Sequence, residues 1–469
     1  MISSQIPNPE VFKKKDFSVF KKCFKNIFKE RENAKILVSL SGGSDSVLLL
    51  YLMLRFFESD KQNITVAHIN HNLRTNSVDD QKFILELGKI LKVDTIIREL
   101  NPSDKTKKES VESWAREGRY NILNELAIET ESDVIVTGHH KNDQVETILK
   151  NLSEQAGLYG LSGMKVEYKN IIRPLLSFSK NQLNKMIDKY NIPYINDSSN
   201  DNLNFKRNFI RKQIVNPWER HDNEVVKSIA IAGSNFQEYQ NALQFFINDF
   251  ISIHVSQTKE SYFTISKNEF NKLPLIARIL VLQNLTTTLG RLRKYDFENI
   301  KNFLVNKKIG NIYKSRFGWV LLNDRIQYLL QVNQANIKKT KKRIYEQKKM
   351  NYNNYEYIIK KVDKNSKFSF DPNIELFELD KIKNRKLYLR LWRSGDSFSP
   401  LGVSGNQKVS DYLVNKKVNQ FEKWNQVVLV AEEKIIWLCG HRIDNSVKVS
   451  NSSKNVVEIK RVVQSNPQL

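Results

Sequence analysis

The chain has 469 residues, enough for about three domains, and 75 Lys and Arg against 51 Asp and Glu give it a formal net charge of +24. This excess predicts an anionic partner, nucleic acid before an anionic membrane, although a lysine-rich solvated surface would give the same count. The two cysteines, Cys23 and Cys439, exclude a disulfide framework and a cysteine-based zinc or iron–sulfur site within one chain. The longest apolar run, residues 47–54, is too short to cross a membrane and the start lacks the apolar core of a signal peptide, so we expect a soluble cytoplasmic protein.

The N-terminal half alternates short apolar runs with stretches of helical period. Strands are expected at residues 35–40, 63–69, 93–100, 133–138 and 170–176, and helices at 45–58, 77–91, 110–130, 142–152 and 179–191. This alternation predicts an α/β fold, a doubly wound parallel sheet with helices on both faces, which we assign to residues 1–217. Ligands of such sheets bind at the carboxyl ends of the strands.

The rest of the chain divides into three further segments. Residues 218–336 show apolar residues at helical spacing and predict a helical middle domain. Residues 337–380, which include the charge run at 338–349, are assigned to a connector, and residues 381–469 to a small α+β C-terminal domain. Strands are expected at 355–362, 386–392, 427–433 and 434–440, around a helix at 408–414.

The motif SGGSDS, residues 41–46, follows the first expected strand and opens a helix. Backbone N–H groups and a helix N-terminus gather around anions in this arrangement, and glycines allow close approach. The Walker A pattern with its lysine is absent, as is the dinucleotide pattern G-x-G-x-x-G. A carboxylate beside phosphates requires a bridging Mg²⁺, which we assign to Asp45; the alternative is an ordinary turn with Asp45 as a helix cap. The predicted nucleotide-binding residues are Ser41, Gly42, Gly43, Ser44, Asp45, Ser46 and Gly138.

Acidic and histidine side chains follow the fourth expected strand, in GHHKNDQVET. Asp143 and Glu146 are three residues apart and share a helix face, so they could bind Mg²⁺ or steer an ammonium group, unless they are ordinary surface acids. Asp45 and Asp143 are the predicted metal ligands. Of His139 and His140, we expect one to contact nucleotide or base and the other to pack, with His140 counted among the catalytic residues. His68 and His71 are equally consistent with substrate contact and with loop support.

Two arginine pairs have the spacing of a phosphate clamp. Arg116 and Arg119 are one helical turn apart, and Arg207 and Arg211 are four residues apart, so each pair could present two guanidinium groups to one anion. A solvated helix face would show the same spacing.

The loop at 41–46 resembles that of the ATP pyrophosphatases, which cleave ATP to AMP and pyrophosphate while adenylating an oxygen. Further stretches resemble the tRNA(Ile)-lysidine synthetase family in order and spacing. They are AHINHNLR (67–74), AREGRY (115–120), TGHHKNDQVET (137–147), GLYGLSGM (157–164) with RPLL (173–176), and DSSNDNLNFKRNFIR (197–211). The resemblance covers the N-terminal domain strongly and the remainder more loosely.

The resemblance implies a ligase that uses ATP and Mg²⁺ to activate the 2-oxo group of the wobble cytidine in a tRNA(Ile) with a CAU anticodon. Free L-lysine then displaces AMP, and codon specificity changes from AUG to AUA and identity from methionine to isoleucine. The implied catalytic residues are Asp45, Arg116, His140, Asp143, Glu146 and Arg207. A homodimer stays an open option.

The C-terminal segment LYLRLWRSGDSFSPLG with KVSDYL resembles the family's tRNA-binding module, which makes Arg390, Arg393 and Lys408 expected phosphate contacts. The following stretch, EKWNQVVLVAEEKIIW, departs from the family pattern. Three rival functions are a tRNA thiolase, an ATP pyrophosphatase that amidates a metabolite, and an RNA-binding protein with a degenerate loop. The two cysteines form no pair in sequence for a thiolase, and amidation of a metabolite leaves the +24 charge unexplained.

Overall fold

The structure is a computed structural model that describes residues 6–31, 33–73, 77–106, 110–196, 202–259, 261–288, 292–306, 308–332, 340–363, 369–382 and 385–463. Arg74, residues 197–201 of the last N-terminal motif and part of the charge run at 338–349 lie outside these ranges. The chain divides into two compact units, Met1–Phe246 and Ile247–Leu469, and each is described by itself. The predicted boundary between residues 217 and 218 and that between 336 and 337 stay predictions.

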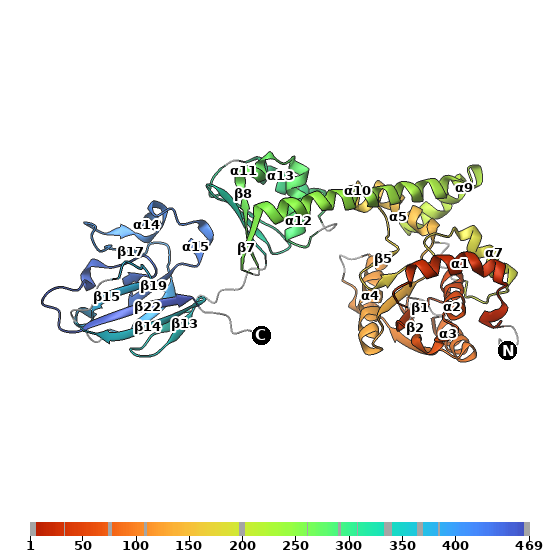
Figure 1. Ribbon diagram of the computed structural model, residues 1–469, viewed down its shortest axis with the longest axis horizontal. Coiled ribbons are helices and arrows are strands. Elements are labelled where there is room, and N and C mark those ends of the chain that lie inside the picture. Colours follow the sequence, from red (N-terminus) through yellow and green to blue (C-terminus); the bar gives the residue numbers. More distant parts are fainter. Residues whose placement is uncertain are drawn as a thin grey trace. The chain divides into compact units, whose positions relative to one another are not determined.

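The first unit is built on a six-stranded sheet in the order β3-β2-β1-β4-β6-β5 (Figure 1). All neighbouring strands are parallel except β5, which runs antiparallel to β6 at the edge. The predicted parallel sheet is therefore confirmed. Its strands are β1 (Ile36–Ser39), β2 (Ile64–Asn70), β3 (Asp94–Glu99), β4 (Val134–Thr137), β5 (Glu167–Tyr168) and β6 (Ile171–Ile172).

Alternating residues of β1 face two separate hydrophobic cores, as the two-residue period of a strand requires. Ile36 and Val38 pack in a core that includes residues of α1, α2, α3 and α7, whereas Leu37 packs in a core with residues of α4. Both faces of the sheet are thus covered. These helices are α1 (Lys14–Ile27), α2 (Ser44–Phe56), α3 (Ser77–Leu91), α4 (Val111–Glu129) and α7 (Lys180–Lys189).

The remaining helices of the first unit follow β4 and β6 along the chain. They are α5 (Lys141–Ser153), α6 (Leu158–Leu161), α8 (Lys206–Phe209), the π-helix η5 (Ile210–Val215), α9 (Asn216–His221) and α10 (Val225–His254), with short 3₁₀ turns η1 (Pro9–Val11), η2 (Lys61–Asn63) and η3 (Pro102–Asp104). Helix α10 begins in this unit, and its last turns, from Ile247, belong to the second.

The beginning of the second unit carries the predicted helices together with an unpredicted sheet. Helices α11 (Lys267–Lys272), α12 (Leu275–Leu285) and α13 (Lys294–Val305) accompany an antiparallel sheet in the order β7-β8-β11-β10-β9. Its strands are three to five residues long: β7 (Val255–Lys259), β8 (Tyr262–Ser266), β9 (Ile312–Lys314), β10 (Val320–Asn323) and β11 (Gln327–Gln331). Strands this short, one of them reading VSQTK, show little apolar alternation.

The end of the second unit contains two further antiparallel sheets, ordered β12-β16-β19-β20-β21 and β13-β14-β22-β15, and the small pair β17-β18. The strands are β12 (Lys342–Arg343), β13 (Met350–Tyr352), β14 (Tyr355–Val362), β15 (Ile374–Glu378), β16 (Leu387–Leu391), β17 (Ser397–Phe398), β18 (Gln407–Lys408), β19 (Val427–Ala431), β20 (Lys434–Leu438), β21 (Arg442–Ile443) and β22 (Val456–Val463). Helices α14 (Val409–Asn415) and α15 (Gln420–Trp424) and the turns η6 (Leu379–Ile382) and η7 (Asn445–Val447) complete it.

The segment assigned to a connector differs from that expectation. Strands β14 and β15 both pair with β22, near the C-terminus, and β12 pairs with β16. Residues 340–363 and 369–382 are therefore integral to the C-terminal sheets, because their backbone hydrogen bonds are made there. Among the described helices none is long and apolar enough to cross a membrane.

Candidate active site

The loop after β1 has the shape of an anion cradle. Gly43 precedes the first residue of α2, and Gly42 has a φ of +85°, a conformation that favours glycine. The Ser46 hydroxyl accepts a hydrogen bond from the Ser41 N–H at 3.2 Å and donates one to the Gly43 carbonyl at 2.9 Å. These bonds fix the loop from inside. The first N–H groups of α2 then have no helical partner of their own, which is the arrangement that binds phosphate.

Gly138 lies where β4 meets the first turn of α2. A Cβ at this position would lie 3.2 Å from both Cα and N of Ser46, which are backbone atoms that cannot rotate away. A side chain at Gly138 would therefore require the Ser46 backbone to move by a few tenths of an ångström, which favours glycine where the carboxyl end of β4 meets the loop.

Asp45 points at cations instead of capping α2. Its Oδ1 lies 2.7 Å from Lys180 Nζ and its Oδ2 lies 3.5 Å from His140 Nε2, while the cap position is Gly43 without a side-chain bond. Burial raises the pKa of Asp45, but His140 and Lys180 outweigh that effect, so the pKa lies below its usual value. The interpretation of Asp45 as a cap is therefore wrong.

His140 caps α5 and faces two carboxylates. Its backbone N–H donates to Asp143 Oδ2 at 2.9 Å, and its Nδ1 accepts from the Asp143 N–H at 3.3 Å, a reciprocal capping box. Because Nδ1 accepts, the ring proton is placed on Nε2, which lies 3.5 Å from Asp45 and 3.4 Å from Asp143. His140 thus joins the two predicted metal ligands.

His139 has a different environment. Its Nδ1 lies 2.9 Å from the Thr137 hydroxyl, and burial, assisted by Arg119 and Arg207 and opposed by Asp143, holds its pKa well below the usual value. This environment favours the neutral form of the His139 ring. His68, for its part, is buried with Nδ1 2.9 Å from the Leu40 carbonyl, which favours loop support.

Arg207 and Arg211 bind the two acids of α5. Glu146 is fully buried and is contacted by Arg207 Nε at 2.8 Å, Arg211 Nε at 2.6 Å and Arg211 Nη2 at 3.0 Å. Asp143 Oδ1 lies 2.8 Å from Arg207 Nη2 and 3.4 Å from Arg211 Nη2. The arginine pair does converge on anions, but these anions belong to the protein.

The two arginines of AREGRY have different positions. Both guanidinium groups lie over the Tyr120 ring, but Arg119 lines the cavities around the loop, whereas Arg116 is exposed and lines none of the described cavities. Arg119 has no carboxylate partner among the described residues, and burial lowers its pKa. The site role assigned to Arg116 stays a prediction, and Arg119 is the arginine whose position fits it.

Two cavities open at the carboxyl ends of β1 and β4. One of about 1290 Å³ has Asp45, Asp143, Glu146, Lys180 and Arg207 among its lining residues, and one of about 160 Å³ lies against Ser39, Tyr120 and Thr137. They share five lining residues: Ser41, Gly43, Asp45, Arg119 and His139. The larger volume exceeds that of an ordinary small-molecule pocket, so more than one substrate can fit.

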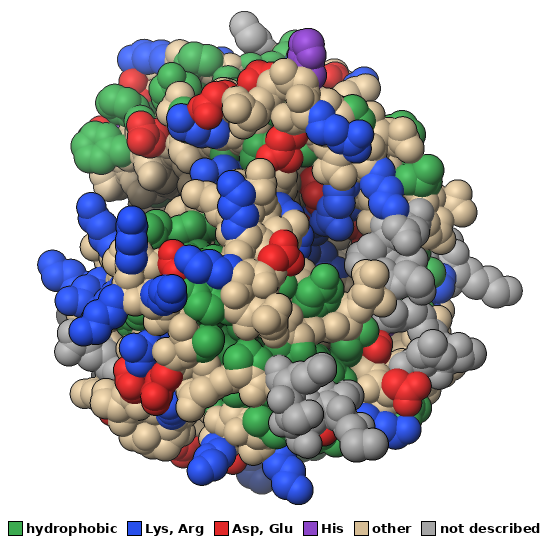
Figure 2. All heavy atoms as spheres, turned by 90° about the vertical axis from the view of Figure 1, so that its right-hand side faces the viewer, with side chains coloured by type: hydrophobic (Ala, Val, Ile, Leu, Met, Phe, Trp, Pro, Cys, Tyr) green, Lys and Arg blue, Asp and Glu red, His purple; other side chains and the backbone are tan. Residues whose placement is uncertain are grey.

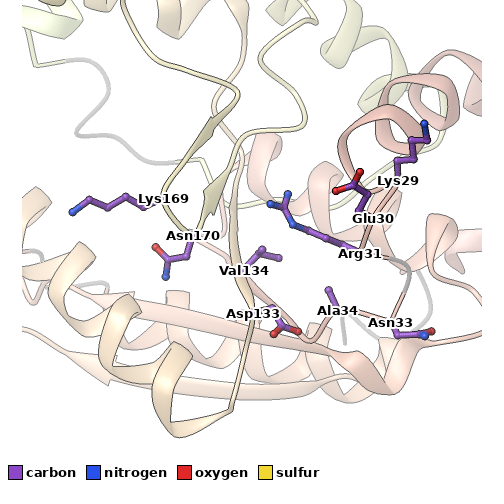
Figure 3. Close-up of a pocket in the computed structure, with 9 residues that line it drawn as sticks. All are labelled: Lys29, Glu30, Arg31, Asn33, Ala34, Asp133, Val134, Lys169 and Asn170. Atoms are coloured by element: carbon purple, nitrogen blue, oxygen red, sulfur yellow. The ribbon is translucent and has the colours of Figure 1, made fainter. Parts of the chain in front are cut away.

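Another hollow, of about 750 Å³, lies at the opposite ends of the strands (Figure 3). Ala34 precedes β1 and Val134 begins β4, so this hollow is at the amino ends of the sheet, away from the loop. It is lined by Lys29, Glu30, Arg31, Asn33, Ala34, Asp133, Val134, Lys169 and Asn170. Arg31 forms an ion pair with Glu167, and no residue of the loop at 41–46 lines this hollow.

Sequence reasoning missed Lys180, the first residue of α7. Its ammonium contacts Asp45 and donates to the Ser44 hydroxyl at 2.9 Å. It lies 135 residues from Asp45 in the sequence, and only the fold brings them together.

The residues present fit Mg²⁺ at Asp45 better than at Asp143. Mg²⁺ that accompanies ATP needs one or two carboxylates, since the phosphates supply further ligands. Both oxygens of each carboxylate have a partner, but the Asp45 side chain is 26% exposed and that of Asp143 only 11%. Within the described ranges no cluster of three or more His, Cys, Asp or Glu could hold a metal without substrate.

The C-terminal candidates are not alike. Arg390 is buried and binds Asp396 through two N–H groups at 2.7 and 2.9 Å, so it stabilises the fold and is not free for phosphate. Arg393 and Lys408 are exposed, and their contact with RNA stays a prediction.

Comparison with known proteins places this site in a family. A family model described as a PP-loop domain matches residues 17–218. The tRNA(Ile)-lysidine synthase of Clostridium tetani is 27% identical over 447 residues, which cover 91% of this chain and 94% of the relative. That of Bacteroides thetaiotaomicron is 29% identical over 437 residues, covering 91% and 95%. Over nine tenths of its length, the chain is thus similar to tRNA(Ile)-lysidine synthases.

The tRNA(Ile)-lysidine synthase of Pseudothermotoga lettingae is 39% identical over 183 residues, 39% of this chain and 41% of the relative. The similarity to these tRNA(Ile)-lysidine synthases confirms the resemblance recognised from the five motif stretches. The cysteines do not contribute to this site, because Cys23 lies in α1 and Cys439 is fully buried in the second unit, and neither lines a described cavity.

Proposed function

We propose that the chain joins L-lysine to the wobble cytidine of the CAU-anticodon tRNA(Ile) at the expense of ATP. It is an enzyme of the ligase kind, as its family relatives are. In the first step the cytidine 2-oxygen attacks the α-phosphorus of ATP and pyrophosphate leaves. In the second the lysine amine attacks C2, loses a proton and displaces AMP. The modified base pairs with A instead of G, which changes the codon from AUG to AUA.

One observation supports this proposal above all: a phosphate-binding loop and a network of acids and arginines line the same cavity. Ser41, Gly43 and Asp45 line this cavity together with Asp143, Glu146, Arg207 and Arg211. An adenylation followed by amine attack needs a phosphate site beside a site that recognises a cationic nucleophile.

The residues divide the work according to their charges. The start of α2 and Arg119 attract phosphate oxygens, and Mg²⁺ held at Asp45 would neutralise their charge. Asp143 stays ionised because His140 and Arg207 outweigh burial and lower its pKa, so its charge attracts the ammonium of lysine. Glu146 holds Arg207 and Arg211 in place from beneath.

The basic surface supports tRNA as the substrate. The net charge of +24 exceeds what solubility requires, and Figure 2 shows numerous Lys and Arg side chains on the face of the molecule that it presents. A metabolite-amidating enzyme would have no use for this surface.

The experiment that tests the proposal is incubation of the chain with ATP, Mg²⁺, radiolabelled lysine and a CAU-anticodon tRNA(Ile) transcript. We expect acid-precipitable label that requires ATP and disappears when the wobble cytidine is replaced by uridine. Label that is independent of the wobble base would refute the substrate. Pyrophosphate release without label would retain the ATP chemistry and refute lysine as the nucleophile.

A further inference from the structure

The ammonium of Lys180 lies over the first turn of α2, where phosphates are expected. Its Nζ is 2.7 Å from Asp45 Oδ1 and 2.9 Å from the Ser44 hydroxyl. The side chains of Lys180 and Asp45 are 33% and 26% exposed, and both line the large cavity. An anion that entered the cavity towards the start of α2 would therefore come within reach of this ammonium.

The backbone of Lys180 is fixed, and its side chain is long. The Lys180 N–H donates to Asn142 Oδ1 at 3.0 Å, and Asn142 Nδ2 donates to Glu219 at 3.0 Å, while Ser179 caps α7. The beginning of α7 is thereby attached to α5 and α9. The four-carbon stem of Lys180 can still move the ammonium by several ångströms without any shift of the helix.

We propose that Lys180 is a phosphate ligand supplied from outside the loop, paired with Asp45 only until Mg²⁺ and ATP arrive. This inference rests on the proposed use of ATP by this site. Mg²⁺ carries twice the charge of an ammonium and replaces it at Asp45. Lys180 then binds the phosphate oxygens beside it. In P-loop enzymes a lysine within the loop makes this contact, and SGGSDS contains no lysine.

If Lys180 changes partner in this way, its removal should have two effects of opposite sign. ATP should bind more weakly without Mg²⁺, and Mg²⁺ should bind more easily at Asp45. Without Mg²⁺, ATP loses a charge-assisted contact and also meets an unneutralised Asp45, so binding should weaken strongly. With Mg²⁺, Asp45 is more accessible to the metal, because no ammonium has to be displaced. A static ion pair that only shapes the loop predicts an equal loss of ATP affinity with and without Mg²⁺.

The test is equilibrium dialysis of radiolabelled ATP against the full chain, without tRNA or lysine, in EDTA and in a series of Mg²⁺ concentrations. For Lys180→Met we expect the Kd of ATP to rise about tenfold or more in EDTA and less than about threefold at saturating Mg²⁺. The Mg²⁺ concentration that gives half-maximal ATP binding should fall. Lys185→Met is the matched control, because Lys185 is exposed on the same helix and lines none of the described cavities.

A double-variant cycle separates phosphate contact from simple neutralisation of Asp45. In the Asp45→Asn background, Lys180→Met should still weaken metal-free ATP binding, and Lys180→Arg should retain most of it. No effect of Lys180→Met in that background would overturn the proposal, as would an equal loss with and without Mg²⁺ or undetectable binding to the unaltered chain in EDTA. Since no tRNA is present, failure of lysine transfer and failure of this exchange are distinguishable.

Discussion

Replacing Glu146 by Gln tests whether this buried carboxylate organises the arginine side of the cavity. Glu146 is fully buried and accepts three hydrogen bonds from Arg207 and Arg211, at 2.8, 2.6 and 3.0 Å. Gln has the same shape, but one of its two terminal groups is an NH₂, which cannot accept from the arginine N–H groups that it faces. Its carbonyl oxygen keeps two of the three bonds if it takes the place of Oε2, which accepts from both arginines, and one if it takes the place of Oε1. The substitution therefore removes a charge and leaves one or two of these bonds unmade.

The size of the effect follows from these contacts. Hydrogen bonds to charged groups contribute about 1.5–3 kcal/mol each, which gives about 1.5–6 kcal/mol for the one or two bonds lost, before correction. The correction is large, because the side chains of Arg207 and Arg211 are 24% and 32% exposed and Asp143 still contacts both. We expect a net loss of about 2–3 kcal/mol in the free energy of unfolding of the first unit, or about 5–10 °C in its transition temperature.

Scanning calorimetry of the full chain measures this change, with the two units expected as separate contributions to the trace. Glu131→Gln is the control, because Glu131 forms an exposed ion pair with Lys35 in the same unit, and such pairs contribute little. If the transition temperature falls no more for Glu146→Gln than for Glu131→Gln, the structural role of Glu146 is refuted. A direct role in binding the ligand would then be favoured.

Four further results are expected. Asp45→Ala should abolish AMP formation while tRNA still binds in filter assays, since tRNA affinity comes from distributed Lys and Arg contacts; undiminished turnover would contradict the role of Asp45. Gly138→Ala should weaken ATP binding in dialysis, because its Cβ meets the Ser46 backbone at 3.2 Å, whereas Gly157→Ala, with nothing within 4 Å, should not. The affinity for tRNA should fall with salt at a log–log slope of about −0.7 to −0.9 per neutralised phosphate, and a flat titration would remove our account of the basic charge. Because folding lowers the pKa of Asp143, the stabilising contribution of its carboxylate is complete above about pH 4 and is lost as the pH falls. In urea titrations the free energy of unfolding of Asp143→Asn should therefore fall less at acid pH than that of the unaltered chain.

The elements that the sequence predicted well are those with a long, regular pattern. Helix α3 begins and ends at the predicted residues, and β14 coincides with the predicted strand at 355–362. Helix α1 was not predicted, although Phe17, Phe20 and Phe24, all buried, repeat at helical spacing. The middle sheet was missed because its strands are short and its pairing is set by tertiary contacts.

The site was predicted in part for the same physical reason. The loop, His140 and the acids of α5 are each close to a strand end in the sequence, so local pattern found them. Which arginine of AREGRY enters the cavity depends on the rotation of α4 against the sheet, and the sequence spacing treats Arg116 and Arg119 alike. Lys180 had no local signal, because its partner Asp45 belongs to another element.

Several charges of the cavity are paired with one another, and we expect this pairing to set an order of events. Asp45 is held by Lys180, and Glu146 by Arg207 and Arg211, so a ligand at either place has to replace an existing partner. Arg119 differs, since no carboxylate among the described residues contacts it and burial makes its charge costly. An incoming phosphate gains most at Arg119 and displaces nothing there. We therefore expect ATP to bind first at Arg119 and the start of α2. The replacement of existing partners at Asp45 and around Asp143 should follow.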